Sequence, residues 1–70
     1  MIVENFSKRL KFMREEVGLT RDALAKKTGF SGAAITRWEK AETIPNIETL
    51  AVFAKFFKCS AGYLLGTEDN

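Results

Sequence analysis

Only three residues, Gly29-Phe30-Ser31, separate two short segments of helical period, and this narrow gap restricts the fold more than any other feature of the chain. Thr20 is a good N-cap for the first segment, because its hydroxyl can accept a hydrogen bond from a first-turn amide. Gly29 is a good C-terminal stop, because glycine adopts positive φ at little cost. Ser31 can cap the second segment, which we expect to end near Lys40. The pattern therefore predicts two short helices joined by a tight turn.

The residues around this turn meet the packing demands of a helix-turn-helix unit, in which two helices cross at a large angle. A small side chain is needed where the helices approach each other, and Ala25 supplies one. An apolar side chain must fill the angle between them, and we expect Ile35 to do so with Trp38 packed beside it. The sequence thus predicts a helix-turn-helix over residues 20–40.

The N-terminal part of the chain has the pattern of one longer helix. We expect this helix over about residues 4–17, where apolar side chains recur at steps of three and four and so share one face. Gly18 then provides a stop. The predicted buried face consists of Phe6, Leu10, Met13 and Val17.

The C-terminal part predicts a loop and two further helices. Residues 41–45 should form the loop, because Pro45 disfavours helical geometry in the residue before it. Asn46 can cap the next helix, and Ser60 can cap a last short helix that ends before Gly66. The first of these helices carries its apolar residues at helical spacing: Ile47, Leu50, Phe53, Ala54 and Phe57. No segment alternates with a period of two, so we predict an all-α fold, with one domain over residues 1–66 and an acidic tail over residues 67–70.

The composition argues against several classes of protein. A chain of 70 residues allows one domain. Cys59 is the only cysteine, so no disulfide can form within the chain, which fits a reducing, cytoplasmic setting, and we expect its side chain to be small and buried. No apolar run approaches the roughly 20 residues of a membrane span, and the start of the chain does not have the pattern of a signal peptide. The sequence has no histidine, paired catalytic acids, phosphate loop or metal-ligand cluster, which argues against an enzyme, a cofactor or a metal site.

The second helix of the central pair has two different faces. On a helical wheel, Ala34, Ile35 and Trp38 lie on an apolar arc. The opposite arc carries small, polar and basic residues: Gly32, Ala33, Thr36, Arg37 and Lys40. Residues 20–40 contain five basic residues and two acidic ones, although the net charge of the whole chain is only +2. A thin, positive face is what a helix needs in order to lie in the major groove of DNA.

Short motifs follow one another along nearly the whole chain, from about Phe6 to Gly66. They are Arg9-Leu10-Lys11, Arg14-Glu15-Glu16, Gly18-Leu19-Thr20, Leu24-Ala25-Lys26-Lys27, Gly29-Phe30-Ser31, Ile35, Trp38-Glu39, Pro45, Thr49-Leu50, Ala54, Ser60 and Tyr63-Leu64-Leu65-Gly66. Each motif is weak alone, but in this order and spacing they resemble the Cro/repressor-type helix-turn-helix family, also called XRE-like. The resemblance implies a compact five-helix, lambda-repressor-like DNA-binding domain whose third helix enters the major groove of double-stranded DNA.

The resemblance also implies roles for individual residues. Arg14 and Glu39 match a pair that forms an ion pair between the first and third helices. Ala41 stands where the family usually has glycine, so we expect the turn after the third helix to differ. The positions that face DNA in the family are occupied here by Arg21, Ser31, Gly32, Ala33, Thr36, Arg37, Lys40 and Thr43.

The positions that face DNA depart from the family pattern at three places. Arg21 stands where the family usually has a glutamine that touches the DNA backbone, which suggests a stronger phosphate contact. Gly32 and Ala33 fill positions where many relatives carry polar side chains that read bases, although Ala33 could touch a thymine methyl group. Direct readout should then depend mainly on Thr36 and Arg37, with DNA shape supplying the rest.

Several apolar residues lie off the expected core. Phe12, Val52 and Phe56 fall outside the faces that their helices otherwise bury, and the last two share one face of their helix. The region of the last helix, with Tyr63 and Leu65, is the usual dimer surface of the family. We therefore expect a dimer or partner contact at Val52, Phe56, Tyr63 and Leu65.

Two functions remain open. The first is a sequence-specific regulator of transcription, a repressor that binds double-stranded DNA as a homodimer and excludes polymerase from a promoter. The second is a protein-interaction module on the same fold, such as an antitoxin-like or assembly partner. Gly32 and Ala33 favour it, because they leave few groups that can read bases. We expect neither to need a cofactor, a metal or a membrane.

Overall fold

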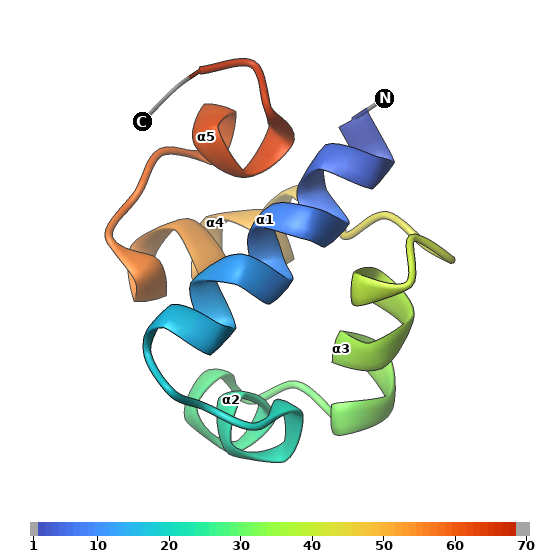
Figure 1. Ribbon diagram of the computed structural model, residues 1–70, viewed down its shortest axis with the longest axis vertical. Coiled ribbons are helices and arrows are strands. Elements are labelled where there is room, and N and C mark those ends of the chain that lie inside the picture. The colour runs from blue at the N-terminus through green and yellow to red at the C-terminus, as the bar shows by residue number, and fades with distance from the viewer. Residues whose placement is uncertain (1, 69–70) are drawn as a thin grey trace.

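The structure is a computed structural model that describes residues 2–68, and in that range it contains five α-helices and no strand. They are α1 (Ile2–Glu16), α2 (Arg21–Thr28), α3 (Gly32–Glu39), α4 (Ile47–Phe57) and α5 (Ala61–Leu65). Figure 1 shows α1 crossing in front of α4, with α5 near its beginning, α2 near its end and α3 beside it. The all-α fold is therefore confirmed, while the last two residues of the predicted tail, 69 and 70, lie outside the described range. None of the helices in residues 2–68 is long and apolar enough to cross a membrane.

Four polar side chains cap helices as predicted, each accepting a hydrogen bond from the backbone N–H three residues later. The donor–acceptor distances are 3.1 Å for Thr20, 3.0 Å for Ser31, 2.8 Å for Asn46 and 2.9 Å for Ser60. A cap of this kind contributes about 1 kcal/mol to stability. Together with the stop at Gly29, whose φ is 82°, the caps set the short gap between α2 and α3.

The turn after α3 has a left-handed conformation at Ala41. Ala41 has a φ of 60°, and its N–H donates to the carbonyl oxygen of Trp38 at 3.1 Å. The N–H of Glu42 donates to the carbonyl oxygen of Arg37 at 2.9 Å, which completes the helix end. An L-residue with a side chain in this conformation costs about 1 kcal/mol, so the turn is strained.

All five helices contribute to the core, and Phe53 is at the centre of its aromatic part. The centroid of its ring is 5.2 Å from that of Phe30, 5.5 Å from Trp38, and 6.2 Å from both Phe6 and Phe57. The buried apolar residues are Phe6, Leu10, Leu24, Ala25, Ile35, Phe53, Phe57 and Leu64. The residues predicted to fill the crossing of α2 and α3 all belong to this core or pack against it.

Two apolar residues lie elsewhere than the helical period predicts. Val17 is 53% exposed, because α1 ends at Glu16 and Val17 belongs to the following turn. The buried face of α1 continues instead through Arg14. Ile47 is 85% exposed, because it is the first residue of α4 and lies off the face that carries Phe53. The predicted start of the first helix is also two residues late.

The residues expected outside the core divide into two groups. Phe12 and Val52 are exposed, as predicted. Phe56 is not, because its ring packs edge-on against that of Phe57 with 5.0 Å between the centroids, and the side chain is half-buried. Cys59 is half-buried as well, and this burial raises the pKa of its thiol above the ordinary value.

Candidate nucleic-acid interface

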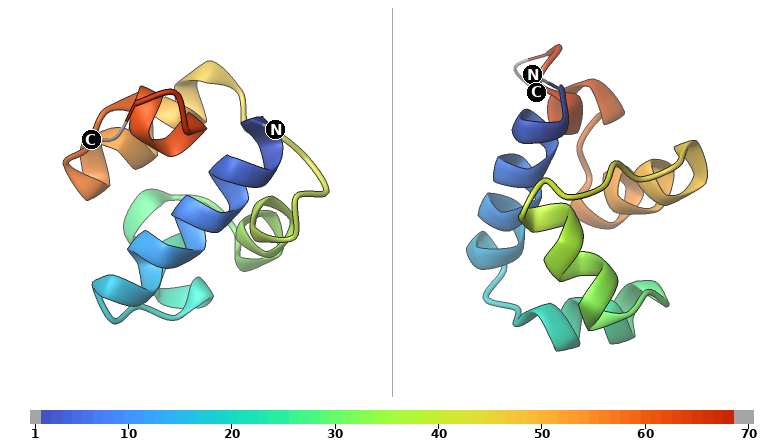
Figure 2. Two further views of the ribbon diagram at one scale, coloured as in Figure 1. Left: turned by 45° about the horizontal axis from the view of Figure 1, so that its top comes forward. Right: turned by 90° about the vertical axis from the view of Figure 1, so that its right-hand side faces the viewer.

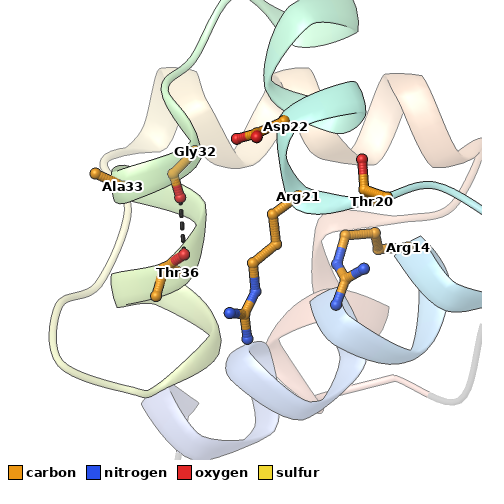
Figure 3. Close-up of a pocket in the computed structure, with 7 residues that line it drawn as sticks. All are labelled: Arg14, Thr20, Arg21, Asp22, Gly32, Ala33 and Thr36. Carbon is orange, nitrogen blue, oxygen red and sulfur yellow. Dashed lines mark hydrogen bonds between the residues drawn. The ribbon is translucent and has the colours of Figure 1, made fainter.

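An open groove lies between the start of α2 and the outer face of α3 (Figure 3). It has a volume of about 590 Å³ and is lined by Arg14, Thr20, Arg21, Asp22, Gly32, Ala33 and Thr36. In the right-hand view of Figure 2, α3 faces the viewer and α2 crosses beneath its start. The α2 side of the groove thus supplies charged side chains, whereas the α3 side supplies small ones.

Glu39 lies behind this groove and joins three helices. The Nε and Nη2 atoms of Arg14 donate to its two carboxylate oxygens at 2.7 and 3.1 Å, so they form the ion pair that the family resemblance implied. The Nη1 atom of Arg14 donates to the carbonyl oxygen of Leu19 at 2.8 Å. The hydrogen bond to Glu39 raises the pKa of the Arg14 guanidinium above its ordinary value. The Glu39 side chain is 0% exposed, so the carboxylate depends on these partners in place of water.

Arg21 is a second partner of the same carboxylate, which the sequence did not indicate. Its Nε atom donates to Oε1 of Glu39 at 3.0 Å, and its side chain is 37% exposed. A guanidinium carries five N–H donors, so this bond leaves its terminal nitrogens available at the groove. The ion pair orients the head group beside the face of α3.

The residues of α3 differ in what they offer to a ligand. The Thr36 hydroxyl donates to the carbonyl oxygen of Gly32 at 2.9 Å, so it is engaged within its own helix. Ala33 and Arg37 are exposed on successive turns of the helix. Arg37 therefore has the longest polar reach on this face.

The structure gathers four of the eight predicted DNA-facing residues in the groove: Arg21, Gly32, Ala33 and Thr36. The other four lie outside its lining. Ser31, Arg37 and Lys40 are exposed, at the start, middle and end of α3, and Thr43 is half-buried in the loop that follows. Thr20 and Asp22 also line the groove, and neither was singled out as a site residue. Only the crossing of the two helices reveals them, because nothing in their spacing distinguishes them from other first-turn residues.

The predicted dimer or partner residues lie on two helices. Val52 and Phe56 are on α4, and Tyr63 and Leu65 are half-buried on α5. The ring of Tyr63 faces α1, where the guanidinium carbon of Arg9 lies 4.2 Å from its centroid.

A protein-family model described as Helix-turn-helix matches residues 10–64. Over 65 residues the chain is 37% identical to Repressor protein C2 of Salmonella phage P22, an alignment that covers 93% of this chain and 30% of that protein. Over 64 residues it is 34% identical to the HTH-type transcriptional activator BcrR of Enterococcus faecalis, with 91% and 31% covered. The chain thus spans about 30% of the length of these relatives.

Two solved structures share the fold. One is the P22 c2 repressor protein in complex with a synthetic operator, with a TM-score of 0.83, 36% identity, and 90% of this chain and 96% of that chain covered. The other is an HTH_3 family transcriptional regulator from Vibrio cholerae, with a TM-score of 0.82, 31% identity, and 97% and 38% covered.

Proposed function

The chain belongs to the helix-turn-helix family of DNA-binding transcription regulators, and we propose that it acts as a dimer that recognises an operator with α3 in the major groove. The family is one of regulators rather than enzymes, which agrees with the expectation from the sequence. The observation that carries the proposal is the likeness to a repressor solved with its operator, which extends over 90% of this chain.

The groove and the face of α3 supply the chemistry for this role. The terminal nitrogens of Arg21 contact a backbone phosphate while its Nε atom stays bonded to Glu39. Arg37 reaches a base edge or a phosphate, and Ala33 contacts a thymine methyl group. The remaining contacts with the duplex come from Ser31, Gly32, Thr36, Lys40 and Thr43.

Dimerisation raises the affinity for operator DNA to a functional level, because the α3 helix of a single copy makes few base contacts. Two copies joined through Tyr63 and Leu65, with Val52 and Phe56 nearby, place their α3 helices in successive major grooves about 34 Å apart. A dimer on a promoter in the cytoplasm then represses transcription by excluding polymerase.

A titration of labelled duplex, selected from a random library, tests the proposal. We expect affinity to fall as salt rises, because basic side chains displace counterions from phosphates. Arg37→Ala should weaken binding by about 1–3 kcal/mol. Lys55→Ala, which removes one exposed positive charge from α4, serves as the matched control and should have little effect. Affinity that is independent of salt, or unchanged in Arg37→Ala, would contradict the proposal.

The exposed apolar side chains of α4 favour a second candidate, the protein-interaction module. Ile47 is 85% and Val52 is 38% exposed. Capture of a partner protein that is lost in Val52→Ser, together with an absence of duplex binding, would support this function over the first.

A further inference from the structure

Asp22 occupies a place in the groove that the proposed function does not use. Its side chain extends from α2 toward Gly32 at the start of α3 (Figure 3). A Cβ atom added to Gly32 would collide with Oδ1 of Asp22 and would lie 3.6 Å from its carboxyl carbon. The carboxylate therefore fills the space that a side chain at position 32 would take.

The Asp22 carboxylate has no ion pair or hydrogen bond to any other residue in the described part of the chain, and the residue is exposed. Arg21, its neighbour in sequence, is bonded to Glu39 instead. An ionised carboxylate can only accept hydrogen bonds, and it repels phosphates. Its place in the first turn of α2 suits the positive end of that helix, and beside DNA it also needs a donor to offset its repulsion of phosphates.

The major groove offers two kinds of donor, the N4 amino group of cytosine and the N6 amino group of adenine. Adenine also presents the acceptor N7 beside its amino group, and guanine presents two acceptors, so both repel a carboxylate. Thymine presents an acceptor and a methyl group. Cytosine is the only base whose major-groove edge combines a donor with no acceptor.

We propose that Asp22 is a specificity-determining residue that accepts a hydrogen bond from the N4 amino group of a cytosine, in the space left open by Gly32. This inference rests on the proposed function, because it requires α3 to lie in the major groove. The inference assigns to a residue of α2 a base contact that Gly32 cannot make, because glycine has no side chain.

The test measures affinities for duplexes that carry each of the four base pairs at every position of the site selected by the unmodified protein. We expect one position at which cytosine is preferred over guanine by about tenfold. Asp22→Ala should abolish that preference and leave the other positions unchanged. Asp22→Asn should move it to adenine, because an amide can bond N6 and N7 together.

Two further variants serve as controls. Gly32→Ala should displace the carboxylate and reduce the cytosine preference at the same position, whereas the Asp22→Ala background has no cytosine preference left for it to reduce. Glu48→Ala removes an exposed acid from the first turn of α4 and should leave every base preference intact.

The outcomes separate this inference from the function on which it rests. If Asp22→Ala tightens binding to all duplexes by one factor and changes no preference, Asp22 acts only by repulsion and the inference is overturned. If the unmodified protein selects no duplex, the proposed function fails and the inference fails with it. If the choice of duplex sequence depends on Arg37 but not on Asp22, the inference is overturned while the proposed function stands.

Discussion

The aromatic cluster around Phe53 and the charged cluster around Glu39 both hold α3 in place, but with different chemistry. The rings of Phe30, Trp38 and Phe53 lie within 5.5 Å of one another, centroid to centroid, and such apolar contact has no preferred direction. Around Glu39, two guanidinium groups share one carboxylate through bonds of 2.7–3.1 Å, which are directional. The first cluster stabilises the fold by burying apolar surface, whereas the second ties α3 to α1 and α2 through directional bonds.

The largest effect is expected from breaking the aromatic cluster. Phe53→Ala should lower the free energy of unfolding by about 4 kcal/mol, because it removes a fully buried ring and leaves a cavity. Chemical denaturation monitored by circular dichroism measures the loss. Phe53→Leu, which keeps most of the volume, should cost much less, and an equal loss for both variants would contradict the assignment of Phe53 as the centre of the core.

The charged cluster should be the next most sensitive region. Glu39→Ala should cost about 3 kcal/mol, because it leaves the largely buried guanidinium of Arg14 without its partner. The double variant Arg14→Met with Glu39→Met should lose less than the sum of the single variants Arg14→Met and Glu39→Met, since neither buried charge is left without its partner and the remaining guanidinium of Arg21 is 37% exposed to water. Equilibrium unfolding of all four proteins checks the cycle, and strict additivity would show that the two side chains are not coupled.

Arg21 belongs to the charged cluster and also lines the groove, so its removal tests both stability and DNA binding. Arg21→Gln should cost less than about 1 kcal/mol of stability, since the side chain is 37% exposed. The slope of log affinity against log salt should fall by about 1, as for the loss of one phosphate contact. Lys26→Gln, on an exposed part of α2, is the control for charge alone. An unchanged slope in Arg21→Gln would show that Arg21 makes no phosphate contact and acts only within the charged cluster.

The smallest effect is expected where neither cluster reaches, at the turn after α3. Ala41→Gly should stabilise the protein by about 0.5 kcal/mol, because relief of the left-handed strain exceeds the extra entropy that glycine gives the unfolded chain. Ala33→Gly, inside α3, should instead destabilise it by up to about 1 kcal/mol. Thermal unfolding measures the change in stability of both variants. A loss of stability in Ala41→Gly would show that the backbone at Ala41 is not strained.

Local chemistry explains how much of this fold could be predicted from the sequence. The caps at Thr20 and Ser31 depend on bonds within three residues, and the sequence indicates them directly. Periodicity does not reveal which turn of a helix the core covers, so Val17 and Ile47 were assigned to buried faces and are exposed.

The candidate site was predicted less completely, because its contacts join residues far apart in the chain. The family resemblance supplied the pairing of Arg14 with Glu39, but Arg21 reaches the same carboxylate from 18 residues away. The proximity of Asp22 to Gly32 likewise depends on how α2 crosses α3 and has no sequence signature.

The close approach of Asp22 and Gly32 limits how the recognition surface can be exchanged between relatives. A larger residue at position 32 displaces the carboxylate at position 22, so a substitution at one position changes the surroundings of the other although they lie on different helices. A graft that copies only the outer face of another protein's third helix onto this chain would keep an acid beside the new side chain. The grafted helix face fits this chain only when the residue at position 22 is replaced as well.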